Sequence, residues 1–220
     1  FSLRSQLTSI ERSDRIVIVG YTESDIAALN EPILSDENLY LLLSKILKQN
    51  PKLVGLDFFR DTLNENSNQL QKLFQKESRL YVAARFLGNK QEKILPPSTV
   101  PLERVGDVSV PLDFDGVLRR NFLSVCQLRD PNLDRCQRYI PSLSLRLPLA
   151  DLKTEGIDLE RNEKGWFQLG NGVFPQVIPH TGGYINVPSG GGYQILVNWR
   201  SPFQSFTTVT VSEVIEGNVS

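Results

Sequence analysis

The stretch NPKLVGLDFF, residues 50–59, decides the fold class, because it ends a helix and begins a strand. Asn50 and Pro51 stop the helical pattern that precedes them, since proline lacks the amide hydrogen that a helix needs. The apolar run that follows is too short for a helix. We therefore predict a buried strand over Lys52–Phe59.

The residues upstream supply a helix and an earlier strand. The helix runs from Ser35, its predicted cap, to Gln49, with leucine and isoleucine along one face. The earlier strand, Arg15–Tyr21 (RIVIVGY), is rich in β-branched residues, and we expect it to be buried. A helix between two apolar strands with short loops is the pattern of a right-handed β-α-β crossover, so we expect the two strands to pair in parallel.

Further segments repeat this order in the N-terminal half. Acidic residues in ESDIAALN (23–30) favour a short helix directly after the first strand, because they lie at the positive end of the helix dipole. A helix over about 66–75 and a strand over 79–86 follow. This half is predicted to be α/β.

The C-terminal half shows the patterns of hairpins and loops. One hairpin is predicted around DFDG (113–116) and another around Asn171–Gly172. Between them a helix starts at Pro141, with Pro148 late enough to kink or end it. A last helix is predicted with Ser212 as its cap. The fold class is therefore an α/β single domain with a mixed, mainly parallel N-terminal sheet flanked by helices and with antiparallel hairpins added in the C-terminal half.

Composition excludes several classes of protein. A chain of 220 residues with 40% hydrophobic residues can build an ordinary core, and one domain is favoured. The net charge of -1, with both signs interspersed, argues against nucleic acid as a partner. The apolar run Leu39–Leu47 is well below the ~20 residues that span a bilayer, so no membrane segment is predicted. The chain starts at Phe1 without a methionine or signal pattern, so we expect it to be part of a longer protein.

Polar residues follow the first two strands at the point where ligands bind in open α/β sheets. Tyr21, Thr22 and Glu23 end the first strand, and Asp57 ends the second. If these strands are parallel neighbours, the four side chains lie close together. Asp57 could then act as a general base, a metal ligand or a ligand contact, or it could only cap a loop.

The stretch ILVNWRSPFQSF, residues 195–206, predicts a strand with a polar end. Ile195, Val197 and Trp199 alternate onto one face that we expect to face the core. Asn198 and Arg200 lie on the other face, just before Pro202 stops the strand. They are predicted to form a pocket, a joint that fixes the following turn against Asp57 or the DFDG hairpin, or both.

Charged residues near the DFDG turn have two interpretations. Asp113 and Asp115 resemble the first half of a calcium loop, but the remaining ligands are absent, so we favour a simple turn. Of Arg119 and Arg120, one must face inward and needs a carboxylate or a ligand anion beside it. His180, the only histidine, lies in a glycine-rich loop without companion ligands. We predict no catalytic residue, no metal and no cofactor.

The two cysteines bracket a polar loop. Cys126 and Cys136 could be two separate thiols or a disulfide, which would stabilise the fold by about 2.8 kcal/mol for a loop of this length. Spacing alone leaves both alternatives open.

Several stretches resemble, in order along the chain, the CHASE family of extracellular sensory domains of the second type, named for cyclases and histidine kinases. The matching stretches are RIVIVGYTESDI, NPKLVGLDFF, VPLDFDGVLRR, IPSLSLRL and ILVNWRSPFQSFTTVTVSEVIEG. The resemblance implies an extracytoplasmic input domain attached to membrane helices and to a cytoplasmic adenylate or guanylate cyclase, histidine kinase or serine/threonine kinase.

The resemblance also bears on the domain boundaries and the cysteines. It implies that residues 1–14 are the tail of a helix next to the membrane and that 15–220 are the sensory domain, with an oxidising exterior that favours the Cys126–Cys136 disulfide. Two departures are present. Thr22 stands where the family commonly has aspartate, and the stretch 170–192 is longer and richer in glycine than we expect.

Three functions remain open at this point. The first is a bacterial receptor's sensory domain that binds an unidentified small-molecule or protein stimulus, with Tyr21, Thr22, Glu23, Asp57, Arg119, Asn198 and Arg200 as candidate ligand-binding residues. The second is an extracytoplasmic hydrolase that uses Asp57 and Glu23. The third is a dimerisation module without a ligand, and a homodimer is compatible with the first function as well.

Overall fold

The computed structural model describes residues 12–64, 67–88, 91–130, 135–177, 193–199 and 205–219. Contacts divide the chain into two compact units. Among the described residues, the terminal unit consists of 12–51, 64–73 and 198–219, and the central unit of 52–63 and 74–197, each with the gaps given above.

The described residues of these units contain eighteen helices and strands. The helices are α2 (Glu23–Leu29), α3 (Asp36–Lys48), α4 (Asn68–Lys76), the 3₁₀ turn η1 (Leu102–Arg104), α5 (Leu143–Lys153) and α6 (Val211–Glu216). The strands are β1 (Ser13–Gly20), β2 (Val54–Leu56), β3 (Leu80–Ala84), β4 (Val105–Asp107), β5 (Arg120–Phe122), β6 (Ser124–Asp130), β7 (Arg135–Pro141), β8 (Leu159–Arg161), β9 (Phe167–Leu169), β10 (Gly172–Phe174), β11 (Gln194–Leu196) and β12 (Phe206–Thr210). The predicted mixed α/β class is confirmed.

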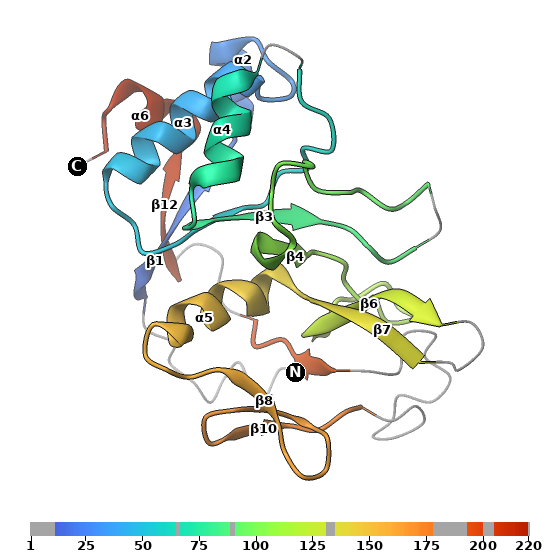
Figure 1. The fold of residues 1–220 in the computed structure, drawn as a ribbon. Coiled ribbons are helices and arrows are strands. Elements are labelled where there is room, and N and C mark those ends of the chain that lie inside the picture. Colours follow the sequence, from blue (N-terminus) through green and yellow to red (C-terminus); the bar gives the residue numbers. More distant parts are fainter. Residues whose placement is uncertain are drawn as a thin grey trace. The chain divides into compact units, whose positions relative to one another are not determined.

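The terminal unit contains a two-stranded parallel sheet of β1 and β12, the first and last described strands (Figure 1). Each strand turns directly into a helix, β1 into α2 and β12 into α6. Helix α3 packs against α6. It begins as predicted at Ser35, whose hydroxyl accepts a hydrogen bond from the amide of Asn38.

Two predictions about the first strand are wrong. Its hydrogen-bonded neighbour is β12 and not β2, because β2 pairs with β3 instead. The strand is also not buried, since Ile16, Val17 and Ile18 are 51%, 57% and 42% exposed. It begins at Ser13, inside the segment predicted as a helix tail, of which residues 1–11 lie outside the described part.

The central unit contains a three-stranded parallel sheet in the order β2-β3-β4. Val82 of β3 and Val105 of β4 are almost completely buried in it. Helix α5 packs against β3 and β4 (Figure 1). Glycine is needed for this approach: a Cβ on Gly106 would lie 2.4 Å from the Cα of Leu143 at the start of α5.

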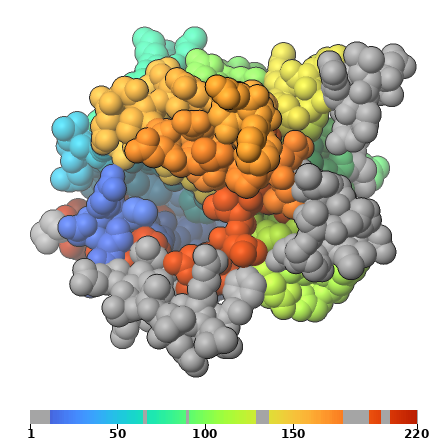
Figure 2. All heavy atoms as spheres, turned by 90° about the horizontal axis from the view of Figure 1, so that it is seen from below, coloured from blue at the N-terminus to red at the C-terminus, as the bar shows by residue number. Residues whose placement is uncertain are grey.

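Three antiparallel sheets complete the described part of the central unit: the hairpin β6-β7, the meander β8-β9-β10 and the pair β5-β11. The hairpin predicted at Asn171–Gly172 is the β9-β10 turn and is confirmed. The meander packs on α5 through a cluster that contains Leu145, Phe167 and Tyr193, and Figure 2 shows its orange spheres directly against those of α5.

Other local predictions need correction. The runs on either side of DFDG do not form a regular ladder with each other, since β4 pairs with β3 and β5 with β11. The turn is closed by an isolated bridge between Leu112 and Leu118 and by backbone hydrogen bonds of Asp113 with Val117 and Gly116. Pro148 does not end α5, which continues to Lys153. The cap of α6 is Thr210 and not Ser212. Among the described residues, every helix is too short or too polar to cross a bilayer.

Candidate functional site

The first candidate region lies where β1 and β12 end. Gly20 and Thr210 are opposite each other in the parallel pair, so α2 and α6 begin side by side. Both helices start with a capping box. Thr22 caps α2 with Asp25 as the reciprocal residue, and Thr210 caps α6 with Glu213.

Asp25 is the residue that joins these two helix starts. Its carboxylate is 1% exposed, and its Oδ2 accepts hydrogen bonds from the amide and the hydroxyl of Thr22 at 2.7 and 2.6 Å. Its Oδ1 accepts a hydrogen bond of 2.8 Å from the amide of Ser212 in the first turn of α6. Burial alone would raise the pKa of Asp25, but the hydrogen bonds from Ser212 and Thr22 outweigh it and lower this pKa to about 2.

Its neighbours Tyr21, Thr22 and Glu23 were predicted as ligand-binding residues. Tyr21 donates its hydroxyl to the carbonyl of Glu31, and burial followed by the negative charges of Glu31 and Asp25 raises its pKa. Thr22 is half-buried and serves as the cap of α2, a role that aspartate also fills well. Glu23 is exposed in the first turn of α2.

Asp57 lies in the other unit, directly after β2, and its side chain is exposed. The expectation that it lies near Tyr21, Thr22 and Glu23 rested on pairing between β1 and β2, which the structure does not have. The buried carboxylate at this edge of the central sheet is Asp107. It accepts hydrogen bonds of 2.7 Å from the amides of Phe86 and Ser109, and desolvation raises its pKa.

The second candidate region is the charge cluster of Asp113, Asp115, Arg119, Arg120 and Gln194. Arg120 is the inward-facing arginine, 3% exposed, and it donates to Asp113 at 2.8 Å and to the side chain of Gln194 at 2.6 Å. Arg119 donates to Asp113 at 3.0 Å and to Asp115 at 2.6 Å. These arginines lower the pKa of Asp113, and Arg119 lowers that of Asp115 to about 2.

This cluster fixes the DFDG turn to the pair β5-β11. The two carboxylates are held by guanidinium groups, which is the geometry of an ion-paired turn and not that of a calcium loop. Within the described residues, no group of three or more histidine, cysteine, aspartate or glutamate side chains could hold a metal ion.

The predicted polar strand end at Asn198 and Arg200 is only partly described. The strand stops at Leu196, two residues before Asn198, which is exposed. Trp199 and Ile195, expected to face the core, are 53% and 41% exposed, so that expectation is wrong. Arg200 and His180 lie outside the described residues.

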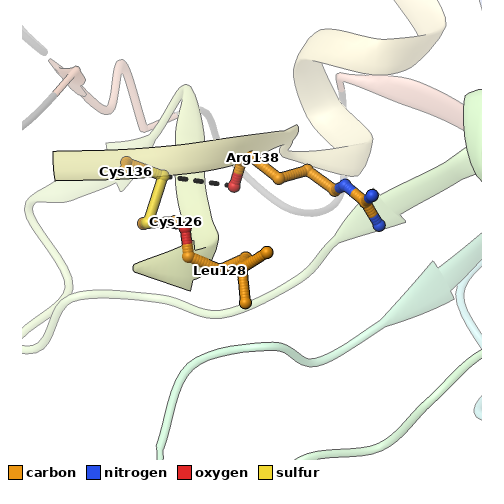
Figure 3. The surroundings of a disulfide bond; sticks show 4 residues. All are labelled: Cys126, Leu128, Cys136 and Arg138. Atoms are coloured by element: carbon orange, nitrogen blue, oxygen red, sulfur yellow. Dashed lines mark hydrogen bonds between the residues drawn. A yellow bond between two sulfur atoms is a disulfide. The ribbon is translucent and has the colours of Figure 1, made fainter. Parts of the chain in front are cut away.

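The disulfide between Cys126 and Cys136 is present and links β6 to β7 (Figure 3). The two Cα atoms are 5.6 Å apart, within the usual range for this bond. Each sulfur also lies near a backbone carbonyl two residues further along its own strand, that of Leu128 or Arg138. The bond lies where both strands leave regular register, so it fixes a part of the hairpin that the ladder secures poorly.

The family model of the CHASE2 domain matches residues 1–220, and the chain belongs to this family. This match confirms the predicted family. CHASE2 is a family of extracellular sensory domains and not of enzymes. No curated protein and no solved structure matches the chain.

Sequence reasoning missed the residue that joins α2 to α6. Asp25 was noticed only as one of several acidic residues in a first helical turn. The threonine three residues before it was the available signal, because T-x-x-D is a capping box. The bond to Ser212 had no sequence signal, because 187 residues separate the partners.

Proposed function

We propose that the chain is the extracytoplasmic input domain of a bacterial transmembrane receptor. It binds a stimulus and passes a change of conformation through adjacent membrane helices to a cytoplasmic cyclase or protein kinase. Membership of the CHASE2 family over residues 1–220 is the observation that carries this proposal. The Cys126–Cys136 disulfide supports a location outside the cytoplasm, because such bonds persist in oxidising compartments.

The candidate ligand residues belong to this proposal. Tyr21, Thr22 and Glu23 lie at the strand end of the terminal unit, and Asp57 and Arg119 belong to the central unit. Arg119 is engaged by two aspartates, so a ligand carboxylate or phosphate would have to compete with them. Glu23 and Asp57 are exposed and could contact a ligand without breaking a buried contact.

A first experiment tests the location in cells that express the full-length protein. Free thiols are blocked with a reagent, the disulfide is reduced, and the newly freed thiols are labelled. We expect Cys126 and Cys136 to be labelled only after reduction. If both cysteines are instead blocked in the first step and take up no label after reduction, they are free thiols in the cell, and this would contradict an extracytoplasmic location.

A second experiment tests binding and output together. The domain is screened by thermal shift against a library of small molecules, since a ligand that binds only the folded state raises the melting temperature. Any compound that raises it is then added to membranes with the full-length protein, and cyclase and kinase activities are measured. Compounds that shift the domain and leave every output unchanged would contradict the proposal. Glu23→Gln and Asp57→Asn then locate the ligand, because the shift disappears in the variant that lacks the contact.

A further inference from the structure

The T-x-x-acid capping boxes of α2 and α6 differ in one respect. Among the described residues, Glu213 binds only its own cap, accepting from the amide of Thr210 at 2.7 Å, and it is exposed. Asp25 binds its own cap and also the first turn of the other helix, through the amide of Ser212. The shorter and fully buried acid therefore connects two helices, whereas the exposed one closes a single helix.

The hydrogen bond between Asp25 and Ser212 uses a backbone amide that has no acceptor within its own helix. Ser212 is the second residue of α6, and the first four amides of a helix have no acceptor within it. The third residue, Glu213, donates its amide to Thr210. The amide of Ser212 donates instead to the carboxylate of Asp25, which lies near the other end of the sequence.

We infer that Asp25 is the joint through which the end of β1 fixes the start of α6, so that a change in the segment Tyr21–Asp25 reaches α6 and the chain that follows it. The transmission of a change to α6 and beyond rests on the proposed sensory function. The fixing of α6 by Asp25 concerns the fold alone. Asp25 is a positioning residue in this role and contacts no ligand.

Three observations support the joint. The carboxylate is buried, so water does not replace a lost partner. It stays ionised at physiological pH, because its pKa is about 2, and hydrogen bonds to a charged acceptor are stronger than neutral ones. Gly20 and Thr210 are paired directly before the two helices, so any displacement of one strand end moves the residues that Asp25 connects.

The test uses two matched variants, Asp25→Asn and Glu213→Gln. Each changes an acid to the isosteric amide at the third position of a capping box. Hydrogen exchange of single amides is measured by NMR. In the unmodified protein we expect the amide of Ser212 to be protected, although amides at this helical position usually exchange fast. Asp25→Asn should speed its exchange by about 10- to 100-fold, the value of one charge-assisted hydrogen bond. Glu213→Gln should leave it unchanged.

Fast exchange of the Ser212 amide in the unmodified protein would overturn the joint, and this result does not depend on whether a variant folds. Equal exchange in Asp25→Asn and the unmodified protein would also overturn it. So would equal acceleration in both variants, because the amide would then report only loosening of α6.

The relay is tested separately in the full-length protein. We expect Asp25→Asn to change the basal cyclase or kinase output and Glu213→Gln to leave it unchanged. One outcome is that Asp25→Asn speeds exchange of the Ser212 amide and leaves the cyclase or kinase output unchanged. In that case the joint is supported and the relay is overturned, provided that the unmodified protein still responds to a compound found by thermal shift. If the unmodified protein has no output that responds, the proposed function itself has failed.

Discussion

The described residues form two parallel sheets, and apolar strands in these sheets differ strongly in burial. In the central unit, β3 is almost completely buried and Val82 is 2% exposed. In the terminal unit, β1 is richer in β-branched residues than β3, and yet Val17 is 57% exposed. Strand composition therefore does not decide burial. The difference lies in the covering element, since α5 packs on β3 and β4 and comes closest at Gly106 of β4.

Each unit contains one of the two tryptophans, which allows the comparison to be tested. Trp166 belongs to the central unit and Trp199 to the terminal unit. Fluorescence of variants that keep only one tryptophan, Trp199→Phe or Trp166→Phe, reports urea unfolding of each unit by itself.

The largest effect is expected for Gly106→Ala. The new Cβ would lie 2.4 Å from a backbone atom of α5, so the helix must move, and we expect a loss on the order of 3 kcal/mol in the transition reported by Trp166. Gly55→Ala is the control, because its Cβ would meet the end of the Leu147 side chain at 2.7 Å, which can rotate away. Equal losses in both variants would show that close approach of the α5 backbone does not set the packing of this sheet.

Removal of the disulfide should affect only the central unit. The double variant Cys126→Ser, Cys136→Ser is expected to lose about 2.8 kcal/mol in the Trp166 transition, because the unfolded chain regains the freedom of the closed loop. The Trp199 transition should keep its midpoint. A shift of both midpoints by the same amount would mean that the two units unfold as one.

Truncation of a strand valine measures the difference between the sheets directly. Val82→Ala should cost about 2.5 kcal/mol, because it removes two buried methyl groups and leaves a cavity. Val17→Ala should cost less than about 0.5 kcal/mol, since its side chain is already largely in water. Urea denaturation checks both values. A cost at Val17 close to that at Val82 would indicate that β1 is covered in solution.

Acid should weaken the terminal unit through Asp25. The folded pKa of about 2 lies below the unfolded value near 3.9, so the unfolded state binds more protons and stability falls as pH drops from about 4 to 2. The expected loss is about 2 kcal/mol in the Trp199 transition, and Asp25→Asn should remove this part of the acid dependence. An unchanged acid dependence in Asp25→Asn would assign the effect to other carboxylates.

Local patterns were sufficient for much of the fold. The helix from Ser35, the β9-β10 turn and the disulfide partners follow from capping, turn chemistry and cysteine spacing with the family resemblance. Strand partners were harder to predict. The sequence favours pairing of β1 with the next strand along the chain, while the structure pairs it with β12, the last one.

The candidate site, like the fold, was predictable in its local features and not in its contacts between distant residues. The sequence located the polar end of β1 and required a carboxylate or a ligand anion beside the inward-facing arginine, and the structure places the carboxylate of Asp113 there. It did not identify Asp25 as a connecting residue, because the contact with Ser212 depends on which strands are neighbours.

The sequence by itself determined the mixed α/β class, most helix positions, the family and the need for an anion beside one inward-facing arginine. These properties depend on contacts over a few residues or on an ordered set of motifs. Only the tertiary structure decided that the first strand is exposed, that the first and last strands are partners, and that one buried carboxylate holds two helices. Such contacts join residues far apart in the chain, and their free energy depends on the elements that pack around them.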